Sequence, residues 1–269
     1  MVAYAATLAE PQQRGKAVGT LTSGVVMGIL LARFISGVTA DLPGWRTVYL
    51  SSACLMLIMA GVLWRAMPST QRPPVKGSYR ALILSVFRLV ITEPILRKRG
   101  VLALLIFAAF SMLWTSMLLP LSAQSLSHTQ IGLFGLAGIA GALAASKAGR
   151  WADRGLGQRT TGLSLLLLTV SWLPIAWAES SLLLLIVGVI TLDFAVQAVH
   201  LTNQSLIFAA RSDAQSRLAG AYMFFYSVGS ALGAVAATQI WSLWGWHAVC
   251  LSGAAVSMAA LLFWLGSRK

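Results

Sequence analysis

Residues 181–204 read SLLLLIVGVITLDFAVQAVHLTNQ, and this stretch decides the class of the protein. After the initial serine, its first nine residues are all apolar. A helix rises about 1.5 Å per residue, so about 20 such residues cross the hydrocarbon core of a bilayer. The stretch therefore predicts a membrane-spanning helix over 181–203.

A polar stripe follows the apolar run inside the same predicted helix. Its four side chains are spaced by four, three and four residues, which places them on one helix face: Asp193, Gln197, His200 and Gln204. Ionisable residues are costly inside a bilayer and mark substrate, ion or proton sites. The alternative interpretation is a hydrogen-bonded network with a purely structural role.

Composition extends the membrane assignment to the whole chain. Hydrophobic residues make up 58% of the 269 residues, charged residues only 10%, and the mean hydropathy is +0.79. These values lie outside the range of soluble domains and predict an all-α, polytopic membrane protein in contact with the lipid bilayer. Seven acidic residues leave no paired carboxylates at catalytic spacing, and common catalytic motifs are missing, so an enzyme is not expected.

Eight apolar segments are long enough to span a membrane. Their estimated bounds are 17–40, 47–66, 100–121, 130–148, 161–178, 181–203, 217–241 and 246–266. If the segments alternate in direction, 18 of the 20 Lys and Arg residues fall on one side. Because basic loops stay in the cytoplasm, the carboxyl terminus is predicted to be cytoplasmic. The net charge of +13 is thereby explained by topology, and no nucleic-acid partner is expected.

Three parts of the chain are expected. Residues 1–66 form one unit with two spans, and residues 100–269 form a six-helix half. Between them, residues 67–99 form a basic cytoplasmic linker, and its apolar middle is too short and too basic to span. We expect a helix there, either lying on the inner leaflet or packed under the bundle.

An internal repeat relates the two ends of the chain. KAVGTLTSGVVMGILLARFISGVTADLPGWRTVYLSSA begins at Lys16, and RLAGAYMFFYSVGSALGAVAATQIWSLWGWHAVCLSGA begins at Arg217. One ungapped shift of 201 positions aligns several glycines and superposes Gly44-Trp45 on Gly245-Trp246. Two helices and their connecting turn therefore occur twice. Four spans precede the second copy and only fifteen residues precede the first, so about four further spans are expected upstream of Met1.

This arrangement resembles the major facilitator superfamily of secondary transporters, with six spans, a basic linker and six more spans. The resemblance implies that the chain holds the end of helix 4 and helices 5–12 of a 12-helix, two-half transporter, and lacks most of the first four helices. GRWADRGLGQR, from Gly149, resembles the cytoplasmic signature loop of the family between helices 8 and 9. The matching residues, expected to act in conformational change, are Gly149, Asp153, Arg154, Gly157 and Arg159.

The resemblance also bears on coupling and on the site. Helix 5 of proton-coupled antiporters is similar at Gly19, Gly28 and Gly37, but here Ala32-Arg33 replaces Gly-Pro. Arg33 is a candidate substrate or gating contact, or it neutralises a neighbouring dipole. The rest of the chain looks most like bacterial inner-membrane efflux members, which favours efflux.

The polar stripe falls in helix 10, which lines the central cavity in this family. Asp193 is accordingly the candidate proton or cation site, with Gln197 as its nearest substrate-facing partner, while Trp114 in helix 7 is interpreted as packing.

The expected function is proton-coupled efflux of a small molecule by alternating access. The rival hypothesis is a non-functional product of an interrupted reading frame. A monomer in the bacterial inner membrane is expected, with no cofactor and no metal, since Cys54 and Cys250 lie in separate spans without a His/Cys cluster.

Overall fold

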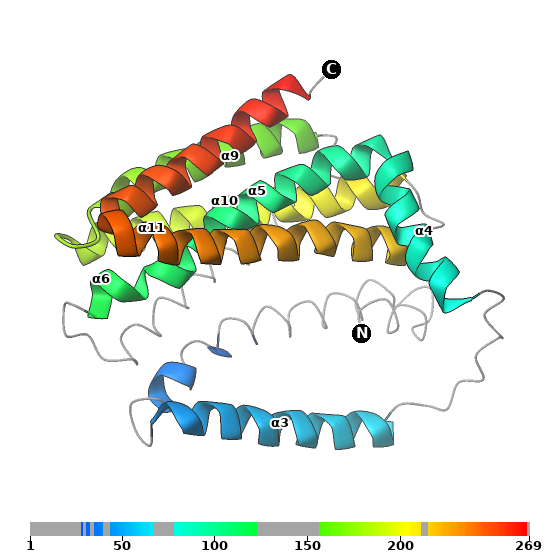
Figure 1. Cartoon of the computed structure of the whole chain (residues 1–269), viewed down its shortest axis with the longest axis horizontal. Helices are drawn as coiled ribbons and strands as arrows, with labels where there is room; N and C mark the ends of the chain where they lie inside the picture. The colour runs from blue at the N-terminus through cyan, green and yellow to red at the C-terminus, as the bar shows by residue number, and fades with distance from the viewer. Residues whose placement is uncertain are drawn as a thin grey trace.

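The structure, a computed structural model, describes residues 28, 31–32, 35–39, 44–66, 78–122, 156–210 and 215–267. Regular structure in these ranges is helical throughout, which confirms the all-α prediction for this part of the chain (Figure 1). The helices are α3 (Trp45–Ala66), α4 (Tyr79–Thr92), α5 (Pro94–Ser116), α6 (Leu118–Ser122), α9 (Gly157–Ala176), α10 (Leu182–Ala210) and α11 (Gln215–Gly266).

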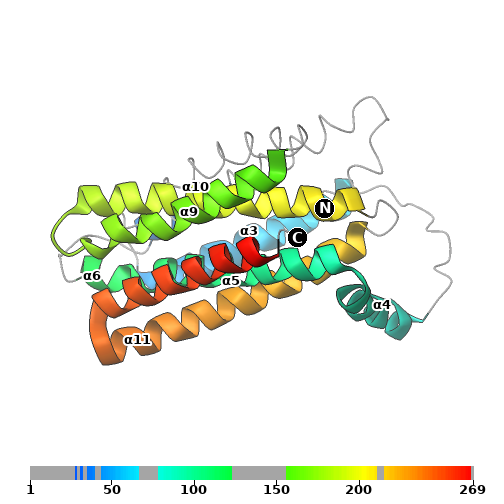
Figure 2. The same cartoon turned by 90° about the horizontal axis from the view of Figure 1, so that it is seen from above.

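Within the described ranges, five helical stretches are long and apolar enough to cross a membrane. The longest of them, α11, is a hairpin, because Gly245 breaks it with φ 73° and ψ −166°. Figure 2 shows its two arms running back along one another. The arms match the predicted spans 217–241 and 246–266. Predicted span 130–148 and most of 17–40 lie outside the described residues, so the predicted number of eight spans stays a prediction.

The turn of the predicted repeat recurs in the backbone. Gly44, directly before α3, has φ 97°, and Gly245 has φ 73°. Both values lie in the left-handed region, which a side chain with a Cβ disfavours. The two copies of Gly-Trp thus begin a helix after the same kind of glycine turn.

Among the described residues, four helices form most of the core: α5, α9, α10 and α11. The first arm of α11 packs directly on the backbone of α5, because a Cβ on Gly229 or Gly233 would collide with the main chain of Leu104 or Ala108. Small residues spaced by four permit this close approach between membrane helices. The shared four-residue spacing on both helices keeps the contact in register over one turn.

Two tryptophans join α9 to the second arm of α11. The ring of Trp172 covers Gly253, and its Nε1 donates a hydrogen bond to Ser257 Oγ at 3.0 Å. Near the other end, Trp264 covers Gly162 on α9. Glycine leaves room for the indole at each place, which is why both rings are buried.

Two shorter helices each add a buried leucine to this core, Leu89 of α4 and Leu121 of α6. α4 contacts α5 and α11, with Leu89 buried, whereas α3 has no buried residue. A helix, α4, lies within residues 67–99, where a linker helix is predicted, and the assignment of this segment as a cytoplasmic linker stays a prediction. The next helix begins earlier than expected, because α5 starts at Pro94 and not at residue 100. Proline is favoured in the first helical turn, and this start places Arg99 inside α5.

Candidate functional site

Asp193 lies near the middle of α10 and is only 5% exposed. Trp114 Nε1, from α5, donates a hydrogen bond to Asp193 Oδ1 at 3.0 Å. Trp114 therefore does more than pack, and the interpretation of this residue as packing alone was incomplete. The contact joins residues 79 positions apart, and no local sequence pattern signals it.

His200 lies two turns further along α10 and has a partner at each ring nitrogen. Its Nδ1 is 3.0 Å from the Tyr222 hydroxyl of α11, and its Nε2 is 3.3 Å from Gln204 Nε2. An amide nitrogen only donates, so in this arrangement His200 Nε2 accepts and Nδ1–H donates to Tyr222. This hydrogen bonding holds the imidazole in one neutral tautomer.

Aromatic rings surround the same imidazole. The Phe107 ring of α5 lies edge to face with it, at a centroid distance of 5.1 Å. Phe107 also packs on Tyr226 of α11, at 4.0 Å between centroids. The polar stripe of α10 thus faces α5 and the first arm of α11, while α9 covers another side of α10.

Gln197 lies between Asp193 and His200 on the stripe and is half-buried. Within the described part of the chain it makes no hydrogen bond. The structure thus gives three of the four stripe residues partners, and leaves the amide of Gln197 accessible beside a buried acid. This arrangement could bind a proton or a small cation at Asp193 and a polar group of a ligand at Gln197.

A second buried polar cluster was missed by the sequence analysis. Arg99, only 5% exposed, donates from Nη1 to Thr161 Oγ1 at 3.0 Å and to Asn203 Oδ1 at 3.2 Å. Asn203 Nδ2 returns a weaker bond to the Arg99 carbonyl at 3.4 Å. Tyr222 lies close to both Arg99 and Asn203. This arginine cluster links α5, α9, α10 and α11.

Several predicted site residues fall outside the described residues. These are Arg33 and three members of the signature loop: Gly149, Asp153 and Arg154. The other two members begin α9, where Gly157 is buried against α10 and Arg159 is exposed. Among the described residues, no group of three or more His, Cys, Asp or Glu side chains could hold a metal ion.

Comparisons with known proteins identify the same family that the sequence resembles, the major facilitator superfamily. The family model described as Major Facilitator Superfamily matches residues 1–207 and 100–269. The chain is 47% identical over 266 residues to YgaY, described as an uncharacterized transporter, of Escherichia coli O157:H7, and equally to YgaY of strain K12. That alignment covers 98% of this chain and 67% of the relative. A transporter of Streptomyces coelicolor, SCO4007, is 28% identical over 254 residues, which are 93% of this chain and 58% of the relative.

Proposed function

Because the chain belongs to the major facilitator superfamily, we propose that it exports a small molecule by alternating access, in exchange for protons. The relatives are named as transporters, and the chain is a multi-pass membrane protein. We place it in the bacterial inner membrane as a monomer with a cytoplasmic carboxyl terminus, because basic residues concentrate on one side of the predicted spans. The rival hypothesis of a non-functional product stays a prediction.

The observation that carries this proposal is the buried carboxyl group of Asp193. A carboxylate at mid-span costs about 2.5–3.5 kcal/mol on insertion scales, and the apolar residues of α10 offset that cost without requiring a function. A purely structural role would be served equally by an amide, which accepts the same hydrogen bond from Trp114. An acid adds one property, the ability to take up and release a proton.

Gln197 is the proposed contact of Asp193 with the transported molecule. It is half-buried, one turn from the acid, and its amide can both donate and accept. His200 and Gln204 are already bonded to Tyr222 and to each other, so we assign them to shaping the site. Arg33 and the signature loop, Gly149 to Arg159, are proposed to act in gating and conformational change.

The test compares Asp193→Asn with Trp114→Phe in purified, reconstituted protein. Infrared difference spectra between acidic and alkaline buffer should show a protonated carboxyl band in wild type that Asp193→Asn removes. Trp114→Phe should keep the band and shift its frequency, because the acid loses one hydrogen-bond donor. Asn at 193 retains an oxygen that accepts from Trp114, so thermal unfolding should change little.

Transport is measured in the same vesicles, which are loaded with a mixed metabolite extract and placed under a pH gradient. Mass spectrometry identifies the solutes that are released into the external buffer. Wild type should release at least one solute faster when the opposite side is acidic, and Asp193→Asn should abolish that dependence. A correctly folded Asp193→Asn protein that keeps pH-dependent release would refute the role of Asp193. If wild type releases a solute saturably and at a rate that does not depend on the pH gradient, proton coupling is refuted.

A further inference from the structure

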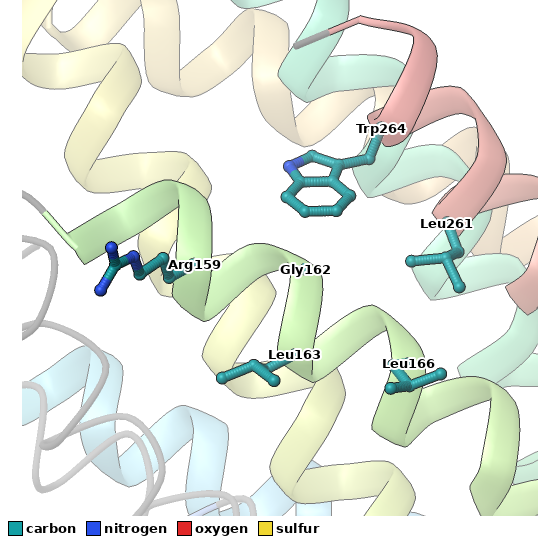
Figure 3. Close-up of a pocket in the computed structure, with 6 residues that line it drawn as sticks. All are labelled: Arg159, Gly162, Leu163, Leu166, Leu261 and Trp264. Carbon is teal, nitrogen blue, oxygen red and sulfur yellow. The ribbon is translucent and has the colours of Figure 1, made fainter.

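A groove runs over the outer surface between α9 and the second arm of α11 (Figure 3). Its volume is about 420 Å³, and six residues line it: Arg159, Gly162, Leu163, Leu166, Leu261 and Trp264. The Trp264 ring lies over Gly162 and is held by a hydrogen bond from its Nε1 to Gln158 Oε1 at 3.1 Å. Trp264 and Leu261 line the groove from α11, and the other four residues line it from α9 (Figure 3).

The groove has a charged end and an apolar end. Arg159 lies in the first turn of α9, and the lining residues of α9 follow it at three, four and seven positions, along one helix face. The guanidinium is exposed and makes no hydrogen bond or ion pair within the described residues. No acidic residue occurs in this first turn, and the positive end of the helix dipole adds to the charge.

The apolar part of this face continues for the length of α9. Leu163 is 69% exposed, Leu166 50% and Leu173 62%, so the face contacts the hydrocarbon of the bilayer in a membrane-spanning helix. Trp177, which is 56% exposed, follows the carboxyl end of α9 and ends this apolar face. An arginine at one end and a tryptophan at the other are typical of a helix anchored at both membrane interfaces. The exposed guanidinium of Arg159 therefore lies at headgroup depth, at the end of an apolar groove.

We propose that this groove binds an anionic phospholipid, with the phosphate at Arg159 and one acyl chain over Trp264, between Leu166 and Leu261. The charge of the groove selects the class of lipid. A guanidinium and a helix amino terminus both favour an anion, and a zwitterionic lipid carries a second charge of the wrong sign. Lipid binding at this lipid-facing surface does not depend on the transported substrate or on proton coupling.

Native mass spectrometry of the whole chain in detergent tests the proposal. The probes are phosphatidylglycerol and phosphatidylcholine with identical acyl chains. Wild type should bind phosphatidylglycerol about tenfold more tightly than phosphatidylcholine, and Arg159→Gln should reduce this preference to near unity, because it removes the positive charge that repels the choline ammonium. Arg88→Gln is the matched control, because it removes an exposed arginine of α4 and leaves the groove intact.

A second pair of variants tests the apolar part. Leu166→Trp fills the groove and should weaken binding of both lipids, whereas Leu173→Trp changes the same exposed face beyond the groove and should not. Thermal unfolding of each variant without lipid checks folding. An unchanged preference in Arg159→Gln, an equal loss in Arg88→Gln, or unchanged binding in Leu166→Trp would overturn the proposal. Competition by millimolar glycerol 3-phosphate would do so too, because it would reveal a site for free phosphate.

Discussion

Replacing Arg99 with methionine removes the guanidinium at the centre of the arginine cluster and keeps most of the side-chain volume. Thr161 retains a partner after this change, because its hydroxyl already donates to the Gly157 carbonyl at 2.8 Å. Asn203 loses a partner, because its Oδ1 accepts a hydrogen bond from Arg99 Nη1 at 3.2 Å in wild type. The substitution therefore leaves one buried amide oxygen without the partner it has in wild type.

Two opposing contributions set the change in the free energy of unfolding for Arg99→Met. A buried acceptor that loses its partner costs about 1–3 kcal/mol, and hydrogen bonds to a charged donor are worth about 1.5–3 kcal/mol each. Against this, Arg99→Met removes the desolvation cost of a buried cation, which offsets a large part of the loss. We expect a net destabilisation of about 1–2 kcal/mol for Arg99→Met.

A double-mutant cycle with Asn203→Leu separates these terms. Asn203→Leu alone should cost about 2–3 kcal/mol, because a buried guanidinium then loses an acceptor. The double variant should be close to wild type, since an apolar pair replaces the whole interaction. The coupling free energy should thus reach at least about 3 kcal/mol. Reversible unfolding of the chain in mixed micelles measures all four proteins.

Additive effects of the two substitutions would refute this reasoning. So would an Arg99→Met protein as unstable as Asn203→Leu, because the uncompensated cation is expected to dominate. Arg99→Lys is the informative control: a lysine keeps the charge but loses the planar fork that reaches Thr161 and Asn203 from one nitrogen. It should be less stable than Arg99→Met.

Two glycine substitutions test the backbone contacts and turns by thermal unfolding in detergent. Gly233→Ala should lower the free energy of unfolding by about 1–3 kcal/mol, because the added Cβ meets the main chain of Ala108. The control Gly220→Ala should be neutral or slightly stabilising, because its added Cβ meets no other atom. Equal effects of the two substitutions would contradict the close contact between α5 and α11. Gly245→Ala should lower the free energy of unfolding by about 1–2 kcal/mol, because alanine disfavours the positive φ at this position. The control Gly266→Ala should have little effect, because this glycine has open space around it and no positive φ. A neutral Gly245→Ala would argue against the glycine turn.

Much of the fold was predictable from the sequence, because a bilayer imposes few choices. Each long apolar segment must be a helix that satisfies its own backbone, so length and hydropathy gave the spans of α3, α5, α9 and α10. The turn at Gly245 was predictable for a different reason. It matches Gly44 at the repeat distance, and both are followed by tryptophan. A repeated sequence folds into a repeated local structure.

The partners of the polar residues were not predictable in the same way. The stripe on α10 follows from helical periodicity, but Trp114 and Tyr222 reach it from other helices, and nothing local identifies them. Arg99 was assigned to the basic linker because it follows Arg97 and Lys98. A run of three basic residues normally marks an exposed loop, and only packing of α5 against α9 and α10 buries the third of them.

The two buried clusters lie at different depths on α10, so substitutions can test them independently. Asp193 and Asn203 are ten residues apart, which is about 15 Å along a helix, half the thickness of the hydrocarbon core. The arginine cluster has its donors and acceptors largely occupied and joins four helices near one end of the bundle. Asp193 instead lies beside the accessible amide of Gln197. A substitution at Asp193 is therefore expected to leave the hydrogen bonds of the arginine cluster intact.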